Sequence, residues 1–542
     1  SVILTDKTGT LTESRMVVTT ALLAGREVEL DDSGNETSAP LLDDMLKTAV
    51  LCNDAVLQKN GKAGQGAVGS PTENALLQAA ATRGMWREDL LRDAPEVAED
   101  PFDPDSKRMA TAHEYEDHVY VAVKGAPEVI ISNCGFVSTE SGDKELDNAG
   151  RRDWLERVEG LGERGLRTLA VARKSAQPGV TDFYGGLTLQ GVFGMEDPPR
   201  HGIGDAIERC RNAGITVIMV TGDHANTATN VATEIGVLGA ADDVPPPLAG
   251  SEVDKMLAAN RHDELLSARV FSRVTPDQKL RLIELHQQQG QVVAMTGDGV
   301  NDAPALRKAD IGVAMGIRGT AVAREAAEMV LQDDDFGTIV AAVEHGRAIF
   351  ENIRKFVVYL LSCNTSEILV VSLATVAGAP LPLLPLQILF LNLVTDVFPA
   401  LALGVGPGRP GLMRDGPRSS SEGILSRRYW IEIGLYGVIM AVITLGAMFV
   451  AVTALGFDVA HAVTIAFSTL ALAQMWHVFN MRGDIGRVFD NEITRNPWIW
   501  AALALCLALV LAAIYVPVLS DVLRLADPGV AGWVLILAAS LV

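Results

Sequence analysis

Cysteine and clustered basic residues are both scarce in this sequence. The 542 residues include five cysteines without paired spacing, which indicates neither a disulfide framework nor a thiolate metal site. The net charge is −22 and no stripe of lysines and arginines is present, so nucleic acid is not an expected partner. A solvated acidic surface accounts for the charge.

An initiator methionine and a signal peptide are missing as well. Ser1 falls inside what reads as a core strand, and Val542 falls inside an apolar run still too short to cross a bilayer. We therefore expect the chain to be a fragment of a longer protein.

Charged residues are unevenly distributed. They make up 21% of a chain whose mean hydropathy is nevertheless positive, at +0.22. Residues 1–355 are mixed and charged, whereas long apolar runs dominate the rest. This division predicts a soluble part followed by a membrane part.

One apolar run near the start ends in a carboxylate. Residues 1–12 read SVILTDKTGTLT, which predicts a buried strand that carries Asp6 to the edge of a sheet, where open α/β folds bind ligands. A carboxylate there can attack phosphorus and become an aspartyl phosphate. The alternative interpretation, without a catalytic role, is a strand and a turn in which the aspartate occurs by chance.

Two later runs repeat the pattern. Residues 217–223 read VIMVTGD and residues 292–302 read VVAMTGDGVND, and helical stretches follow at 225–235 and 276–289. Strands alternating with helices predict a doubly wound parallel sheet whose strands end in one crevice. The crevice would hold the parts of phosphoryl transfer: the nucleophile Asp6, donors at Thr221 and Gly222, the cation Lys279, and Asp298 for Mg²⁺. Taken alone, Lys279 would be an ordinary surface lysine.

The residue two places after Asp6 separates two kinds of phosphate chemistry. Thr8 stands where a phosphatase of the haloacid dehalogenase type carries a second aspartate as general acid and base. Without that group the acyl phosphate should persist. A persistent acyl phosphate suits a molecular machine that uses the intermediate better than it suits a hydrolase. Residues 6–12, DKTGTLT, are the signature of P-type ATPases, and the chain resembles that family.

The resemblance implies a multidomain fold. It comprises a haloacid-dehalogenase-like doubly wound parallel sheet, an inserted α+β nucleotide-binding domain and a transmembrane helix bundle. Residues 1–13 and 197–338 would form the phosphorylation domain, 14–196 the nucleotide-binding domain, and 339–542 the stalk and transmembrane region. Residues 197–200, DPPR, look like the second hinge strand, whose prolines would stiffen the connection.

The resemblance also implies roles at the phosphorylation site. Asp6 would be phosphorylated, and Mg²⁺ would lie between Asp6, the Thr8 carbonyl and Asp298. The residues expected against the phosphoryl group are Thr221, Lys279 and Asn301. The remaining members of the motifs are Lys7, Gly222, Asp223 and Asp302, the last without an assigned role.

Four motifs of the insert resemble the family's ATP-binding segments: GSPTE at 69–73, PF followed by KRM at 101–109, KGAPE at 124–128 and GLRTLA at 165–170. The ATP-binding residues so implied are Glu73 at the adenine amino group, Phe102 stacked on adenine, Lys107, Lys124 and Gly125 nearby, and Arg167 and Arg273 at the phosphates. In isolation, Phe102 would more often be a core residue.

The second part of the chain predicts six membrane spans. A long helix is expected to run from a charged stalk at 339–355 into the first span, because no helix breaker intervenes. The expected spans are 356–378, 384–403, 429–455, 461–480, 497–518 and a truncated 532–542.

Arginines mark one side of this membrane region. They gather between the second and third spans and between the fourth and fifth, whereas residues 378–382 of an alternate loop contain no cation. They are Arg409, Arg414, Arg418, Arg427, Arg428, Arg482, Arg487 and Arg495. The positive-inside rule places these loops, together with residues 1–355, in the cytosol of a multi-pass protein, most simply of the plasma membrane.

Polar residues inside the expected spans point to ion transport. Asn364 and Glu367 are spaced i, i+3, and Asn392, Thr395 and Asp396 are spaced i, i+3, i+4, so each set shares a helix face. Intramembrane carboxylates are costly without a partner, and hard oxygen ligands suit Ca²⁺. Singly, the neutral residues could instead join helices by hydrogen bonds.

Here the resemblance narrows to the type II cation pumps. The motifs around Glu367 and Asp396 match the fifth and sixth spans of calcium pumps of the sarcoplasmic reticulum type. Gln474 takes the eighth-span position where that pump has a glutamate, which puts two-ion stoichiometry, and to a lesser degree Ca²⁺, in question.

The sequence therefore predicts an ATP-driven cation pump with Mg²⁺ as cofactor, ATP and Ca²⁺ as partners, and a lipid bilayer around it. Mn²⁺, Na⁺ or H⁺ remain alternative cations. A membrane-tethered phosphatase or phosphotransferase of the haloacid dehalogenase type is the alternative from another class, and a non-catalytic regulatory relative is a third.

Overall fold

The computed structural model describes residues 1–30, 40–57, 68–115, 118–239, 246–419, 422–483 and 491–541. Arg487 and residue 542 at the end of the expected sixth span lie outside these residues. The chain forms two compact units: Ser1–Arg211 with Ile215–Thr338, and Asn212–Gly214 with Ile339–Val542.

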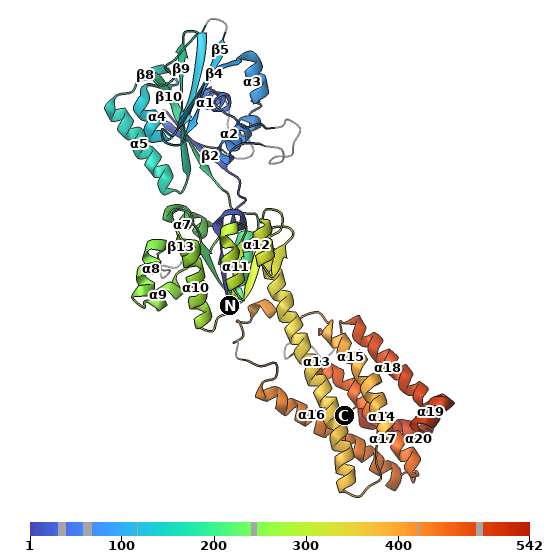
Figure 1. Ribbon diagram of the computed structural model, residues 1–542. Coiled ribbons are helices and arrows are strands. Elements are labelled where there is room, and N and C mark those ends of the chain that lie inside the picture. Colours follow the sequence, from blue (N-terminus) through green and yellow to red (C-terminus); the bar gives the residue numbers. More distant parts are fainter. Residues whose placement is uncertain are drawn as a thin grey trace. The chain divides into compact units, whose positions relative to one another are not determined.

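A parallel sheet is the frame of the first unit. Its strand order is β12-β13-β11-β1-β14-β15-β16. The bounds are β1 Val2–Thr5, β11 Thr216–Val220, β12 Leu248–Ala249, β13 Val270–Ser272, β14 Val293–Gly297, β15 Ile311–Met315 and β16 Met329–Leu331. Helices α6 to α12 alternate with these strands along the chain (Figure 1). They are α6 Ile203–Asn212, α7 Ala225–Glu234, α8 Gly250–Ala258, α9 His262–Ser267, α10 Pro276–Gln288, α11 Ala303–Lys308 and α12 Ala321–Ala326.

The centre of this sheet is β1, which pairs in parallel with β11 on one side and β14 on the other. All four residues of β1 are buried, as an apolar strand covered on both faces requires. The carboxyl ends of the three strands therefore meet at one edge, and the predicted doubly wound sheet is confirmed.

A mainly antiparallel sheet is inserted between β1 and α6. Its order is β3-β2-β10-β9-β6-β5-β4, and β7 pairs in parallel with β10 and antiparallel with β8. The strands are β2 Val17–Leu23, β3 Arg26–Glu29, β4 Glu96–Asp103, β5 Arg108–Tyr115, β6 His118–Gly125, β7 Cys134–Thr139, β8 Gly142–Glu145, β9 Arg167–Ala176 and β10 Leu187–Glu196. The helices are α1 Pro40–Leu51, α2 Pro71–Thr82, α3 Arg87–Asp93, α4 Pro127–Asn133 and α5 Asn148–Glu163.

Two antiparallel segments connect the insert to the parallel sheet. Thr12 bridges Pro199, and the Glu13 amide donates to the Pro198 carbonyl at 3.0 Å. The Thr12 hydroxyl also donates to Asp197 Oδ2 at 2.6 Å. The outgoing and returning chains are thus hydrogen-bonded together where the insert begins.

The second unit is helical. Among its described residues, five helical segments are long and apolar enough to cross a membrane: Phe336–Val376, Pro385–Gly404, Arg427–Thr453, Val459–Met481 and Pro497–Tyr515. The first is the single 41-residue helix α13, as its unbroken sequence predicted. The remaining helices are α14 Pro385–Phe390, α15 Val397–Gly404, α16 Arg427–Thr453, α17 Val459–His477, α18 Pro497–Tyr515, α19 Pro517–Leu523 and α20 Gly529–Ser540.

The second of these segments is not a regular α-helix. Between α14 and α15 the chain forms a π-helical turn, η3 (Leu391–Asp396), where the sequence pattern predicted a uniform span. Such turns widen the helix locally and are common at functional sites. This turn contains Asn392, Thr395 and Asp396.

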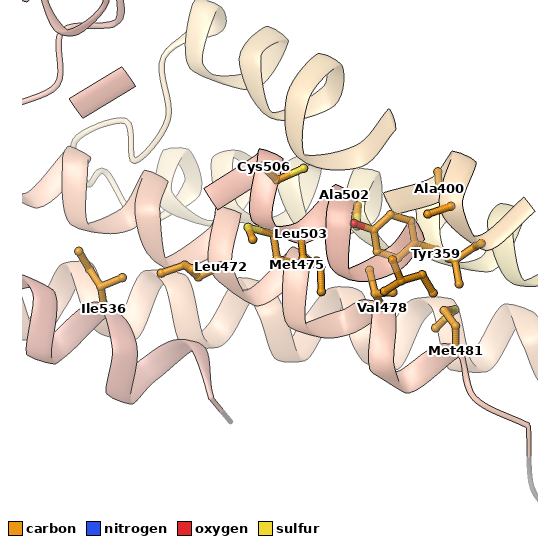
Figure 2. Packing of buried hydrophobic residues seen from close by; sticks show 14 of the residues in the cluster. Tyr359, Ala400, Leu472, Met475, Val478, Met481, Ala502, Leu503, Cys506 and Ile536 are labelled. Carbon is orange, nitrogen blue, oxygen red and sulfur yellow. The ribbon is translucent and has the colours of Figure 1, made fainter. Parts of the chain in front are cut away.

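Buried side chains from several helices form the core of the second unit. Figure 2 shows Tyr359 of α13 among Ala400, Met475, Val478 and other apolar residues of this cluster. Tyr359 is fully buried and is the largest such side chain in the described chain. Its hydroxyl donates to the carbonyls of Thr395 at 3.2 Å and Gln474 at 3.3 Å.

Candidate active site and intramembrane cluster

Asp6 follows β1 directly and begins a tight loop. Its Oδ1 accepts a hydrogen bond from the Lys7 amide at 2.7 Å. The Thr12 amide closes the loop by donating a hydrogen bond to the Lys7 carbonyl at 3.2 Å. Gly9 has a φ of +77°, and a Cβ there would lie 2.4 Å from Asp298 Oδ2. Two features therefore require glycine at this position: the backbone conformation and the close approach of Asp298.

Lys279 joins two carboxylates at the sheet edge. Its ammonium lies 2.7 Å from Asp6 Oδ2 and 2.8 Å from Asp302 Oδ1. Burial raises the pKa of Asp6, and although Lys279 opposes this, the pKa stays above its ordinary value. Burial alone would lower the pKa of Lys279, but the two carboxylates raise it. The ammonium is thus held charged beside Asp6.

Asp298 follows β14 and adds a third carboxylate to the site. Its pKa is raised, chiefly by burial and then by Asp6 and Asp302. Lys279 pairs with Asp6 and Asp302, and Asp298 adds a third negative charge nearby, which leaves a negative excess that a cation would relieve. Within the described residues, no three His, Cys, Asp or Glu side chains form a metal site by themselves. Mg²⁺ commonly binds through one or two carboxylates plus water and phosphate oxygens, and the carboxylates of Asp6 and Asp298 fit that donor set.

The other predicted residues of this edge lie around the loop. Lys7 is buried and pairs with Asp223 at 2.5 Å. Thr221, also buried, accepts a hydrogen bond from the Asp223 amide at 3.2 Å. The side chains of Thr8 and Asn301 are exposed, as is Gly222. The structure thus brings Asp6, Lys279, Asp298 and Asp302 together and leaves Thr8 and Asn301 facing outward.

Asp302, which had no role from sequence, has one in the geometry. The 3₁₀ turn Val300–Asp302 returns its side chain to the strand end, where Oδ2 also accepts from the Gly299 amide at 3.2 Å. Arg200 is a second residue that sequence reasoning left without a site role. Its guanidinium donates to the Gly9 carbonyl at 2.8 Å and so supports the loop from the hinge side.

In the insert, the predicted nucleotide residues Glu73 and Lys124 meet. Lys124 Nζ lies 2.5 Å from Glu73 Oε1, and both side chains are largely buried. Burial alone would raise the pKa of Glu73, but the adjacent ammonium and hydrogen bonds from Asp54 and Ser70 lower it. This pair joins α2 to the end of β6, although 51 residues separate its members.

Three further residues cluster at one end of the insert's sheet. A Cβ on Gly125 would lie 2.6 Å from the carbonyl of Lys107, so these two backbones need glycine to approach. Phe102 is 57% exposed on β4, two strands from β6, which is about 10 Å at ordinary strand spacing. Its exposure fits a stacking platform better than a core residue.

The two predicted phosphate-binding arginines lie on different sheets. Arg167 is exposed at the start of β9. Arg273 follows β13 of the parallel sheet and donates to the ring of His224 at 2.9 Å. His224, at the start of α7, was not singled out by the sequence, because a lone histidine before a helix carries no motif.

The intramembrane residues form one hydrogen-bonded group around Glu367. Its Oε2 accepts from Asn392 Nδ2 at 2.9 Å, and its Oε1 accepts from Gln474 Nε2 at 3.1 Å. The Thr395 hydroxyl in turn donates to Gln474 Oε1 at 3.3 Å. Residues of α13, η3 and α17 thus converge as the sequence pattern suggested.

Two of the residues predicted to join this group, Asn364 and Asp396, differ from the others in their hydrogen bonds. Asn364 donates to the Leu360 carbonyl of its own helix at 2.8 Å rather than to the group around Glu367. Asp396 is 1% exposed, and within the described residues neither of its carboxylate oxygens accepts a hydrogen bond of ordinary geometry. Burying a carboxylate without such hydrogen bonds is energetically costly.

The parallel sheet with an aspartate after its central strand, the antiparallel insert and the long apolar helices define a membrane protein with carboxylates and a lysine gathered at one sheet edge. A family model for "P-type ATPase, cytoplasmic domain N" matches residues 41–202, and one for "Cation transporting ATPase, C-terminus" matches residues 380–542. The chain belongs to the P-type cation-transporting ATPases.

Named relatives are similar along the whole chain. A calcium-transporting ATPase of Bacillus subtilis is 37% identical and a calcium-transporting ATPase 1 of Bacillus cereus 35% identical. A probable cation-transporting ATPase F of Mycobacterium tuberculosis is 38% identical. Each match covers 100% of this chain but 62% of the relative's own length.

Proposed function

We propose that the full-length protein is an ATP-driven pump that exports Ca²⁺ from the cytosol through an aspartyl-phosphate intermediate. One observation carries this proposal: a single chain holds both the Asp6–Lys279 centre and the group of buried polar side chains around Glu367. The relatives named as calcium-transporting and cation-transporting ATPases support it.

Asp6 is the nucleophile of the proposed cycle. One carboxylate oxygen attacks the γ-phosphorus of ATP, the bond from that phosphorus to the β–γ bridging oxygen breaks, and ADP leaves. Lys279, 2.7 Å from Asp6, offsets the negative charge that gathers during transfer. Water later cleaves the acyl phosphate, which releases inorganic phosphate and restores Asp6. Thr8, Thr221, Gly222 and Asn301 border the phosphoryl group in this scheme.

Asp6, Asp298 and the Thr8 carbonyl are the proposed Mg²⁺ ligands. When bound, this cation would neutralise charge between carboxylates and phosphate. Lys7, the residue after Asp6, forms an ion pair with Asp223, which connects the Asp6 loop to the segment after β11.

The insert is the proposed ATP-binding domain. We assign residues 14–196 to it, and residues 1–13 with 197–338 to the phosphorylation domain. The exposed Phe102 would stack on adenine, with Glu73, Lys124 and Gly125 beside it and Lys107 at the rim. Arg167 and Arg273 would contact the phosphates.

Residues 339–542 are the proposed stalk and transmembrane region. Arginines lie between α15 and α16, at the start of α16, and between α17 and α18, and the positive-inside rule supports a cytosolic location for these connections and for residues 1–355. The proposed membrane is the plasma membrane. The transported cation would be held by oxygens of Asn364, Glu367, Asn392, Thr395, Asp396 and Gln474, a hard-oxygen set suited to Ca²⁺.

Phosphorylation of the full-length protein in membranes tests this function. With γ-labelled ATP, acid-stable labelling is expected only when Ca²⁺ is present and is expected to vanish in Asp6→Asn. Labelling that does not depend on the cation, or that persists in Asp6→Asn, would refute the mechanism and favour a tethered phosphotransferase instead.

The identity of the cation needs its own measurement. Stimulation of the labelled enzyme by Ca²⁺, Mn²⁺, Na⁺ and H⁺ is compared, with Glu367→Gln and Asp396→Asn as matched controls. Ca²⁺ is expected to act at the lowest concentration, and both controls are expected to raise that concentration. Equal or stronger stimulation by another cation would replace Ca²⁺ in the proposal.

A further inference from the structure

A buried ion pair connects the start of the first membrane span to a distant connection between helices. Lys355 Nζ of α13 lies 2.9 Å from Glu492 Oε1, and their side chains are 9% and 4% exposed. The Gly483 amide donates to the same oxygen at 2.7 Å. Glu351, one turn earlier on α13, is a second carboxylate 3.8 Å from Lys355 and pairs with Arg409.

This pair is the most buried of the ion pairs in the described part of the second unit. Desolvating two charges costs about as much as their attraction returns, so apolar residues of similar size would stabilise the site equally well or better. Stability alone therefore does not explain the pair. Buried polar groups in general can fix the register of packed elements, as a core asparagine does in coiled coils.

The pair lies on a direct path to the group around Glu367. Along α13, Lys355 precedes Tyr359 by one turn and Glu367 by 12 residues, about 18 Å at the helical rise. Gly483, which shares the Glu492 oxygen, follows η5 (Val478–Met481), the continuation of α17, on which Gln474 lies. An axial shift of α13 would therefore move Glu367 relative to Gln474.

Two hydrogen bonds extend this connection to the helix after η3. Asn352, on the same face of α13 as Lys355, donates to the Gly406 carbonyl at 2.6 Å. Asn496, just before α18, donates to the Ala402 carbonyl of α15 at 2.8 Å. The cytosolic ends of α13 and α15 are thus tied to the connection between α17 and α18.

We propose that the Lys355–Glu492 ion pair sets the axial register of α13 and thereby positions Glu367 for cation binding. Lys355 and Glu492 are positioning residues, since neither contacts the cation-binding oxygens. The inference rests on the proposed function, because cation binding is what it positions.

Cation-dependent phosphorylation of the full-length protein tests the register role. Lys355→Met and Glu492→Gln are each expected to raise the half-saturating Ca²⁺ concentration about tenfold, the scale of coupling between contacting residues. Maximal labelling is expected to stay unchanged, as is phosphorylation by inorganic phosphate without Ca²⁺. Lys355→Arg is expected to restore the wild-type concentration.

A double variant distinguishes an effect of the ion pair on the register of α13 from an effect on the stability of the protein alone. Lys355→Met with Glu492→Met removes both charges, so it is expected to regain thermal stability while keeping the raised Ca²⁺ concentration. Lys308→Met is the matched control, because Lys308 pairs with Glu284 at the same 2.9 Å but with both side chains more than 40% exposed. Recovery of wild-type Ca²⁺ dependence by the double variant would overturn the inference. Absence of cation-dependent labelling in the wild type would instead overturn the proposed function.

Discussion

The phosphorylation centre and the intramembrane group use carboxylates in opposite ways. At the sheet edge, Asp6 and Asp302 share the ammonium of Lys279, and each accepts a backbone hydrogen bond as well. In the membrane unit, Glu367 accepts hydrogen bonds from two amides, whereas within the described residues Asp396 accepts none of ordinary geometry. At the sheet edge the carboxylates have a lysine counter-charge, whereas Glu367 in the membrane unit is hydrogen-bonded by neutral amides.

The largest expected effect tests whether Lys279 is the charge that preorganises the phosphorylation centre. Lys279→Met should slow phosphorylation from ATP about 100- to 1,000-fold, because a preorganised electrostatic partner of the reacting oxygen is lost. Rapid-quench labelling of the full-length protein measures this rate. Lys308→Met on the neighbouring α11 should match the wild type, and a loss of similar size there would deny Lys279 a special role.

The next effect concerns the unsatisfied Asp396. Asp396→Asn should raise the half-saturating Ca²⁺ concentration about 100-fold, since ligand charge sets cation affinity. The same variant should melt at a higher temperature without Ca²⁺, because an uncompensated buried charge is removed. Thermal denaturation and cation-dependent labelling check the two parts. A lower melting temperature would mean that Asp396 already has a partner, and the contrast between the two regions would fail.

A smaller effect distinguishes close approach from backbone strain at the phosphorylation loop. Gly9→Ala combines a positive φ with a Cβ 2.4 Å from Asp298, so a loss of stability above the 1–2 kcal/mol typical of left-handed residues is expected, together with slower labelling. Gly25→Ala is the control, because Gly25 has a φ of +83° and no heavy atom within 4 Å of the built Cβ. Equal losses in the two variants would show that Asp298 does not constrain the loop.

The smallest effect comes from a residue outside both regions. His113 of β5 is fully buried, and burial lowers its pKa from 6.5 to about 4. Between these values the unfolded chain binds the extra proton, so the free energy of unfolding should fall as pH drops, by about 2 kcal/mol from pH 7 to pH 5. Hydrogen exchange at residues 108–115, corrected for intrinsic rates, measures this slope. His113→Gln should flatten the slope, and an unchanged slope would assign it to other groups.

Sequence patterns predicted which side chains meet at the sheet edge, because a parallel sheet brings the ends of its strands together. Asp6, Thr221 and Asp298 each follow an apolar run, and parallel strands end at a common edge. The role of Asp302 was not predicted, since it depends on a short turn that brings the side chain back to Lys279. The ion pair between Glu73 and Lys124 was also unpredicted, although both residues were named.

The membrane unit was predicted less completely. Hydropathy marked the spans, and polar residues within them marked Glu367 and Asp396. The helical spacing that grouped Asn392 with Asp396 assumed a regular α-helix, but η3 is π-helical. Tyr359 and Glu492 gave no signal, because an aromatic residue in an apolar helix and an acid in a loop are ordinary.

The sequence by itself determined the local features of the chain: the strand that ends in Asp6, the apolar runs that form long helices, and the carboxylates placed inside them. Local pattern suffices for these, because burial and chain direction follow from the order of apolar and polar residues. Only the tertiary structure decided which carboxylate received a counter-charge. That outcome depends on side chains far apart in the chain, such as Lys279 and Asp6 or Gln474 and Glu367, approaching within hydrogen-bond distance.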